Sequence, residues 1–351
     1  MDARTMPEII ESEQRWHRVL ASFDRFECFH TWEYTMLEAG RYRGRGFAFH
    51  MQEGSRALFL PVIERGIPGH DLKDLTSAYG YPGPLYRGET AGFAPLWQAA
   101  MQQLRQMGYV SLFSRCSPVF TRHLQPMPEF QRTHGIVVVD LKLSEEEQRR
   151  RYRDNHIRGI KRASGAGLTI ERGALRHIGD FLRLYYATMD RVGASSEYYF
   201  SESYIRALMQ ASEFETRLYL CRLGERIVAA GLFLYCGDIV QYHLGGSDTE
   251  HLQLGSMKLL LDAVRRAAAD EHYSSLVLGG SHKPDDQLFH FKVGFSKNIV
   301  DFYLIKRVLD DDLYDALCRE RNVDPASMSG FFPPYRAYPA GNTNINIAET
   351  L

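Results

Sequence analysis

The segment Leu288-Phe-His-Phe-Lys-Val-Gly-Phe295 places one lysine, Lys292, among the apolar residues of a predicted short helix. These neighbours would bury most of the helix, so the lysine head group either extends to water or is held in a cleft. An ammonium held in a cleft can stabilise the negative charge that collects on an oxygen during acyl transfer. The alternative is an ordinary exposed lysine, because most lysines on such helices do no chemistry. We predict that Lys292 is catalytic.

The elements that would position Lys292 form a regular order. Strands are predicted over residues 216–223, 226–235 and 239–245, joined by turns at Gly224-Glu225 and Gly237-Asp238. A helix then begins at Gly255-Ser256, with apolar residues recurring every three to four positions as far as Ala268. A strand over 275–278, the Lys292 helix and a strand over 299–306 complete this unit, and helices over 179–192 and 201–211 precede it.

The first part of the chain repeats this plan. Helices over 11–22 and 31–39 precede strands over 46–51, 57–63 and 75–79. The rigid loop Gly80-Tyr-Pro-Gly-Pro-Leu85, a helix over 94–107 and strands over 109–113 and 135–141 follow. We therefore expect an α/β protein with mixed sheets, of the α+β kind, built from two tandem copies of one fold.

We expect the domain boundary near Leu143, because Ser144 and Glu147 there form a capping box for a new helix. The predicted domains are residues 1–142 and 143–310. The tail 311–351 contains the aromatic, proline-bracketed segment that ends at Arg336. A free tail of this kind would expose apolar surface, so we expect it to pack back on the first domain.

A basic run follows the boundary, on what we read as one helix. Its cations, within fourteen residues, are Arg149, Arg150, Arg151, Arg153, Arg158, Lys161 and Arg162. Such a face suits phosphate, whereas the alternative is a solvated helix face balanced by the acidic residues 145–147. The formal net charge of -1 argues against a general nucleic-acid binder, including a DNA binder. A single acidic partner, held locally, is compatible with the run.

Composition places the chain among globular proteins, with 44% hydrophobic and 12% aromatic residues. No apolar run reaches the roughly 18 residues of a membrane-spanning helix, and the N-terminus lacks the apolar core of a signal peptide. We therefore expect no transmembrane segment and a cytoplasmic location. The five cysteines form no CxxC pair, and the thirteen histidines lack ligand spacing, so we expect reduced thiols and no metal.

The order β-β-β-α-β-α-β, preceded by two helices, resembles that of the GNAT acyltransferases. In such folds the third hairpin strand and the strand after the long helix splay apart, and the exposed amides there receive an ester or thioester carbonyl. The start of the long helix receives phosphate. The resemblance places the carbonyl site at Tyr242 to Ser247, with backbone amides of Gly245 and Ser247 as catalytic donors. The phosphate site falls at Gly255, Ser256 and Lys258.

Four short motifs resemble the FemABX-like group of GNAT proteins more specifically. They are Asn155-His-Ile-Arg-Gly-Ile-Lys-Arg-Ala163, Phe291-Lys-Val-Gly-Phe295, Tyr79-Gly-Tyr-Pro-Gly-Pro84 and Tyr242-His-Leu-Gly-Gly-Ser247. The resemblance implies an enzyme that moves an amino acid from aminoacyl-tRNA onto an amine. It implies that Lys292 stabilises the oxyanion or the leaving oxygen. With the phosphate site, it places the donor on Arg158, Lys161 and Arg162.

One departure from the Fem ligases concerns the acceptor. Those enzymes carry an arginine four residues before a tyrosine, where it helps to hold a nucleotide-sugar diphosphate, but here Ser195 precedes Tyr199 at that spacing. Arg191 lies eight residues upstream instead. We therefore expect a smaller acceptor than a peptidoglycan precursor. The predicted acceptor-binding residues are Trp32, Tyr79, Tyr81, Arg191, Tyr199 and Tyr242, although such aromatic residues are more often core.

The sequence favours an aminoacyltransferase that forms an amide on a small-molecule or peptide amine, with aminoacyl-tRNA as co-substrate and no bound cofactor. One alternative is an N-acyltransferase that uses acyl-CoA or an acyl carrier protein and acts on an amino sugar or metabolite. Enzymes that use CoA carry Arg or Gln three residues before a Gly-x-Gly or Gly-x-Ala sequence. When Gly255 is aligned with the first of these glycines, Leu252 stands in place of the Arg or Gln and Met257 in place of the second small residue. A second alternative is an inactive GNAT-like binding module.

Overall fold

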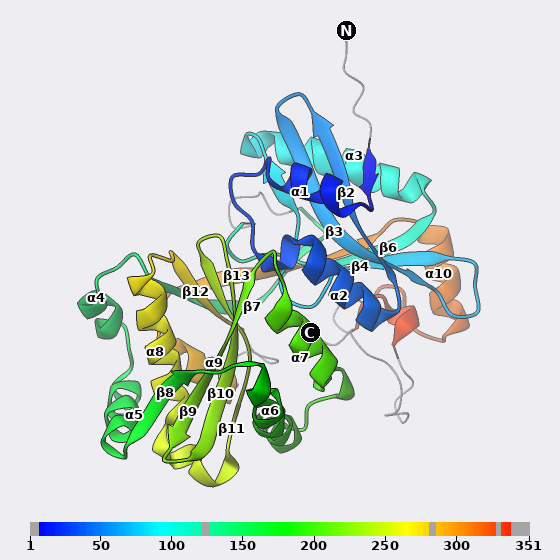
Figure 1. Cartoon of the computed structure of the whole chain (residues 1–351). Helices are drawn as coiled ribbons and strands as arrows, with labels where there is room; N and C mark the ends of the chain where they lie inside the picture. Colours follow the sequence, from blue (N-terminus) through cyan, green and yellow to red (C-terminus); the bar gives the residue numbers. More distant parts are fainter. Residues whose placement is uncertain (1–6, 121–126, 281–285, 328–330, 338–351) are drawn as a thin grey trace. The chain divides into compact units, whose positions relative to one another are not determined.

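The computed structural model describes residues 7–120, 127–280, 286–327 and 331–337 (Figure 1). The chain forms two compact units: unit 1 comprises Met1–Thr133 and Asp301–Leu351, and unit 2 comprises His134–Val300. The division falls within strands β7 (Phe130–Asp140) and β13 (Ile299–Val308). These two units are defined by contacts between residues. The domain limits expected from the sequence, at 142/143 and 310/311, remain a prediction.

Unit 1 is a mixed sheet with helices on both faces. Its strand order is β1 (Glu8–Ile10), β2 (Arg45–Glu53), β3 (Arg56–Gly66), β4 (Lys73–Thr76), β6 (Tyr109–Arg115) and β13, and β5 (Leu85–Arg87) also pairs with β3. Only β4 and β6 run parallel among these pairs. Alternate residues of β2 and β3 face opposite sides. One side packs on α3 (Phe93–Gln106), and the other packs on α1 (Glu13–Leu20) and α2 (Trp32–Tyr42).

The segment after β13 packs on unit 1. Helix α10 (Asp311–Glu320) and Phe332 join a buried cluster with Phe113 of β6. Beneath them Asp74, which is fully buried, accepts hydrogen bonds from Arg65 Nε at 3.0 Å, from the Tyr335 hydroxyl at 3.0 Å and from Arg336 Nε. Apolar packing and a buried ionic network therefore hold this segment together.

Within unit 2 the strand order is β7, β12 (Ser275–Gly279), β11 (Ile239–Ser247), β10 (Arg226–Cys236), β9 (Glu215–Leu223) and β8 (Leu168–Arg172). The β11–β12 pair is parallel, and the remaining pairs are antiparallel. Helices α6 (Ile178–Val192) and α7 (Glu202–Gln210) cover one face (Figure 1). Helices α5 (Asp154–Gly165) and α8 (Ser256–Asp270) cover the other.

The predicted elements of unit 2 are present at nearly their predicted bounds. The turns at Gly224 and Gly237 have positive φ angles of 56° and 57°, which explains the glycines at both hairpins. The five cysteines are buried, and none of them forms a disulfide. Among the described residues, no helix is both long and apolar enough to cross a membrane.

The single basic helix predicted after the boundary is wrong. Two helices occupy this region, α4 (Glu145–Arg150) and α5, with a break around Tyr152. Tyr152 turns inward, so that its hydroxyl donates to Asp262 Oδ1 of α8 at 2.9 Å and its ring lies edge-on to Phe295. Burial of this side chain therefore interrupts the helix and directs α5 across α8, where the two helices pack together.

Candidate functional site

Strands β11 and β12 separate in the middle of unit 2. They pair only where residues 239–241 lie beside residues 275–277, although β11 continues to Ser247 and stays paired with β10 along that length. Within the described residues, the edge of β11 that faces away from β10 between Tyr242 and Ser247 therefore has no neighbouring strand to pair with. This is the arrangement predicted for the carbonyl site.

The two predicted backbone donors of this edge differ in their surroundings. The Ser247 N–H already donates to the Thr188 hydroxyl of α6 at 3.0 Å. Amides alternate in direction along a strand, so the Gly245 N–H points to the same side as that of Ser247. Of the two, Gly245 is the better placed to donate to a substrate oxygen. The long-range contact from Thr188 has no signal in the sequence.

The Tyr242 side chain lies beside Gly245. A β-carbon at Gly245 would collide with the Tyr242 hydroxyl, so this position requires glycine. The hydroxyl itself donates to Met257 Sδ at 3.8 Å, and a thioether is a weak acceptor. Burial raises the pKa of Tyr242, which keeps the hydroxyl protonated. Tyr242 was predicted to bind the acceptor, and its hydroxyl stands next to the carbonyl site.

Lys292 is buried rather than exposed. It lies on helix α9 (Gln287–Val293), its exposed fraction is 8%, and its Nζ donates to the carbonyl oxygen of Gly280 at 2.6 Å. Gly280 follows β12, the strand that leaves β11. Burial lowers the pKa of Lys292 to about 8, and the charge of Asp286 opposes this shift. The lysine is thus a proton donor that can lose its proton near neutral pH. His282 of the same motif lies outside the described residues.

The predicted donor residues converge on the first turn of α8. Gly255, with a φ of 79°, precedes the buried Ser256. The Lys258 Nζ donates to the Asn155 carbonyl oxygen of α5 at 3.3 Å, and a β-carbon at Gly159 would collide with the Lys258 side chain. Burial and the charges of Arg162 and Arg158 lower the pKa of Lys258. The structure thus brings these three cations together beside a helix N-terminus, where a phosphate would relieve their repulsion.

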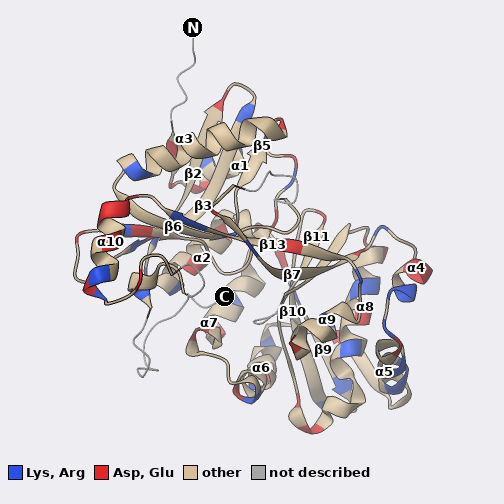
Figure 2. Ribbon diagram, turned by 180° about the vertical axis from the view of Figure 1, so that it is seen from behind, with Lys and Arg blue, Asp and Glu red and all other residues tan. Residues whose placement is uncertain are grey.

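The cations of α5 are exposed. Arg158, Lys161 and Arg162 lie on the solvent side of the helix, and within the described ranges no carboxylate pairs with them. Figure 2 shows the Lys and Arg positions of α5 and α8 in blue on these two helices. By contrast, Arg150 of α4 forms an ion pair with Glu146 at 2.6 Å. The alternative interpretation, a solvated helix face balanced by acidic residues, therefore describes α4 better than α5.

Among the predicted acceptor residues, Arg191 and Tyr199 belong to unit 2 together with Tyr242. Arg191 NH1 donates to the Thr249 hydroxyl at 3.0 Å and to the Ser247 carbonyl oxygen at 3.4 Å, which puts it at the end of β11. Tyr199 is 36% exposed and donates to Asp190 Oδ1 at 2.6 Å. Arg191 therefore reaches the edge that carries Gly245.

The other predicted acceptor residues belong to unit 1 and pack as core aromatics. Trp32 lies edge-on to Trp16, and the Tyr81 ring contacts Phe29 and Phe302. Tyr79 is half-buried, and its N–H donates to Glu38 Oε2 at 3.1 Å. Their contacts agree with the core alternative, and a role in acceptor binding stays a prediction.

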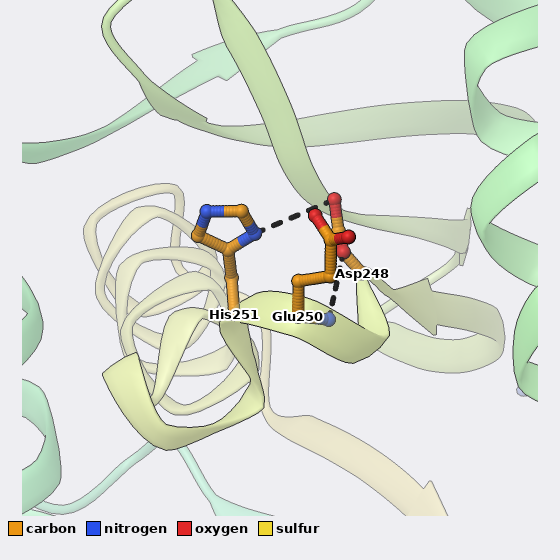
Figure 3. A group of neighbouring side chains, drawn as sticks. All are labelled: Asp248, Glu250 and His251. Carbon is orange, nitrogen blue, oxygen red and sulfur yellow. Dashed lines mark hydrogen bonds and ion pairs between the residues drawn. The ribbon is translucent and has the colours of Figure 1, made fainter.

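A cluster with metal-ligand chemistry, not singled out from the sequence, lies at the end of β11. Asp248, Glu250 and His251 place one ligand atom each within 4.8 Å of one another (Figure 3). Arg226 NH2 already donates to Asp248 at 2.7 Å and to Glu250 at 2.9 Å. Asp248 Oδ1 also caps the following 3-10 helix by accepting from Glu250 N. The Arg226 guanidinium offsets part of the charge of the two carboxylates, and the hydrogen bonds of the cluster stabilise the turn.

Comparison with known proteins gives one family match and several similar structures. Residues 148–292 match the family model described as the acetyltransferase (GNAT) domain. FemX is similar over 88% of this chain and 99% of its own, with 11% identity and a TM-score of 0.65. The C-terminal domain of a putative lysylphosphatidylglycerol synthetase from Agrobacterium fabrum is similar over 88% of this chain and 97% of its own, with 16% identity and a TM-score of 0.53. L-PGS from Bacillus licheniformis is similar over 89% of this chain and 97% of its own, with 12% identity and a TM-score of 0.50. No curated protein matches the sequence.

The family match places a transferase domain of the GNAT acyltransferase type at residues 148–292, as predicted. Residues 148–292 are a GNAT-family domain, and the chain as a whole has the FemX fold, with two GNAT-like domains in tandem. The resemblance to the FemABX-like group is thereby confirmed at the level of fold.

Proposed function

We propose that this protein is an aminoacyltransferase that moves an aminoacyl group from aminoacyl-tRNA to the amine of a small-molecule or peptide acceptor. The observation that carries this proposal is the buried Lys292 of α9, whose Nζ bonds the carbonyl oxygen of Gly280 directly after β12, the strand that leaves β11. Its head group bonds a backbone carbonyl and keeps its proton-donating capacity. Among the described residues no carboxylate forms an ion pair with Lys292, and a lysine buried in this way is costly to keep, so function is the better explanation.

In this mechanism the acceptor amine attacks the ester carbonyl of the aminoacyl-tRNA, and a carbon–nitrogen bond forms. Negative charge on the carbonyl oxygen is stabilised by the Gly245 N–H and the Tyr242 hydroxyl. The carbon–oxygen ester bond then breaks. The leaving ribose oxygen takes a proton from the Lys292 ammonium, and the lysine recovers one from the attacking nitrogen. The products are an amide and tRNA with a free terminal hydroxyl.

The donor side is supported by the cations at the start of α8. Arg158, Arg162 and Lys258 would hold a phosphate close to the carbonyl site, and Lys161 would extend the basic face along the RNA backbone. Aminoacyl-tRNA offers phosphates beyond the reacting end, which suits an exposed helix with several unpaired cations. It is also a cytoplasmic molecule, so we propose the cytoplasm as the compartment.

The acceptor side is supported by Arg191 at the end of β11 and by the aromatic residues Tyr199 and Tyr242. One guanidinium and two phenol rings suit a small amine that carries an anionic group. The comparison proteins agree with amino acid transfer in one respect, since the name lysylphosphatidylglycerol describes an amino acid joined to an acceptor. They support the fold, and the acceptor is part of the proposal.

The second candidate is an N-acyltransferase that uses acyl-CoA or an acyl carrier protein. The description of the matching family as an acetyltransferase favours it, and the phosphate site at α8 would also accept a pyrophosphate. The first turn of α8 speaks against it, because Leu252 and Met257 stand where CoA users carry a polar residue and a small residue.

The deciding experiment incubates the purified protein with an amine mixture and either a charged tRNA pool or an acyl-CoA pool, and follows loss of each donor. We expect loss of aminoacyl-tRNA that depends on amine and on Lys292. Consumption of acyl-CoA alone would establish the second candidate. Consumption of neither, with every common amine class present, would favour a binding module.

A further inference from the structure

Helix α9, which carries Lys292, is completed at its C-terminal end by residues of α5. A seven-residue helix is not stable alone, and its last carbonyl groups have no partners within the helix. Here the Arg153 N–H donates to the Gly294 carbonyl oxygen at 2.9 Å, and His156 Nε2 lies 2.8 Å from the Phe291 carbonyl oxygen. The first turn of α5 therefore supplies donors to the last turn of α9.

The His156 ring fits closely into this junction. It is 2% exposed and lies edge-on to Phe295, with ring centroids 4.6 Å apart. A β-carbon at Gly294 would collide with the ring, so glycine at this position allows the histidine to reach the backbone of α9. The interaction is thus built by residues of both segments.

The hydrogen bond from His156 has a fixed direction. The Phe291 carbonyl can only accept, so Nε2 carries the proton. Burial and the positive charges of Lys258 and Arg153 lower the pKa of His156 to about 4, so the ring is neutral at pH 7. Its Nδ1 lies 2.7 Å from Asn155 Oδ1, and turning this amide by 180° would bring the amide N–H against the unprotonated Nδ1. A neutral ring with one fixed donor therefore clamps the carbonyl next to Lys292.

Lys292 is consequently held at two points: its backbone through the Phe291 carbonyl, and its head group through the Gly280 carbonyl. The first point is attached to α5, the helix with Arg158 and Arg162. We propose that His156 is a positioning residue that fixes the Lys292 helix to the donor-binding helix and so sets where the ammonium stands. This inference rests on the proposed roles of Lys292 and α5 in acyl transfer.

Two variants of His156 separate positioning from packing. His156→Phe keeps a ring against Phe295 but removes the donor, whereas His156→Gln places an amide N–H close to the position of Nε2. We expect His156→Phe to lower kcat roughly 10- to 100-fold, the size of effect that misplacement by about 1 Å produces, with the KM for the donor within about two-fold of the parent. His156→Gln should retain kcat within about three-fold.

A second readout does not depend on the donor. The pH midpoint for acylation of Lys292 by acetic anhydride, followed by mass spectrometry, should be near 8 in the parent protein. It should move toward the ordinary value of 10.5 in His156→Phe and stay in place in His156→Gln. Within the described parts of the chain, Asp286 is the charged group that shifts the pKa of Lys292, and it is unchanged in both variants. His177→Phe is the control, since this buried histidine bonds the backbone at Ala174 and should leave the midpoint unchanged.

The outcomes distinguish the two proposals. If the parent protein consumes neither donor, the proposed function fails, and the Lys292 midpoint still tests the clamp. If folded His156→Phe keeps both the parental kcat and the parental midpoint, the positioning role is overturned. Should His156→Phe not fold, His156→Asn replaces it, because its shorter amide cannot reach the Phe291 carbonyl and should show the same losses.

Discussion

At the scale of single residues, Lys292 unites burial, a lowered pKa and a backbone acceptor in one side chain. We expect Lys292→Ala to lower kcat by roughly 10²- to 10³-fold, a loss in the range typical of a general acid, with a smaller change in the KM values. The measurement is steady-state kinetics with the donor that the protein consumes. Near-normal turnover in a folded variant would assign the chemistry to Gly245 and Tyr242 instead.

The same lysine should lower the stability of the protein. Its folded-state pKa of about 8 lies below the ordinary 10.5, so folding disfavours its charged form. The destabilisation is fully present below pH 8 and disappears as the pH rises from 8 to 10.5. Lys292→Met should therefore be inactive but more stable at pH 7, by at most about 3 kcal/mol. Denaturant unfolding at pH 7 and pH 10.5 checks this, and an equal gain at both values would contradict it.

The pH dependence of turnover tests the protonated form of Lys292. If the ammonium supplies the proton to the leaving oxygen, kcat should fall as the pH rises through about 8. Lys292→Arg should lose this falling limb, because a guanidinium stays protonated there, even if its maximal rate is lower. A parental limb that persists in Lys292→Arg would show that another group titrates.

At the scale of elements, helix α5 should determine donor affinity. Replacing Arg158, Lys161 and Arg162 with alanine should raise the donor KM most at low salt, because neutralised phosphates release counterions. For a tRNA donor, the slope of log affinity against log salt should become shallower by about two. Lys258→Ala is the matched single change at the start of α8, and it should weaken donor binding with less effect on kcat. Unchanged affinity in the triple variant would make α5 a solvated face.

Sequence patterns predict the elements well where the signal is local. Hairpins at Gly224 and Gly237 and the apolar repeat of α8 are visible in the residues themselves. The break at Tyr152 is not, because it depends on a bond to Asp262 more than a hundred residues away. Helix α10 was not predicted, although Asp310, which accepts from Leu313 N, is an N-cap signal that could have found it.

The candidate site shows the same difference between local signals, which the sequence reveals, and long-range contacts, which it does not. The position of Lys292 on an apolar helix predicts its importance, but its burial and its Gly280 partner require the fold. The engagement of the Ser247 amide by Thr188 and the clamp by His156 join distant segments, and no local pattern encodes such contacts.

At the scale of the whole molecule, the buried network around Asp74 should stabilise unit 1. Asp74→Asn leaves the Arg65 and Arg336 guanidinium groups without their shared carboxylate, and we expect a loss of about 3 kcal/mol in the free energy of unfolding. Asp301→Asn is the matched control, since its pair with Arg132 is exposed and should contribute less than about 1 kcal/mol. Equal losses in the two variants, measured in urea, would contradict the assignment.

Unit 2 is inserted, in sequence, between the two parts of unit 1, and this has a consequence for synthesis on the ribosome. Tyr335 and Asp74, which bond in the finished protein, are 261 residues apart in the chain. The N-terminal part of unit 1 therefore stays incomplete, with β6 lacking its partner β13, until all of unit 2 has been synthesised. Unit 2 can complete its fold first, which reverses the usual N-terminal-first order. During that interval the unpaired edge of β6 is the part of the nascent chain most in need of chaperone protection.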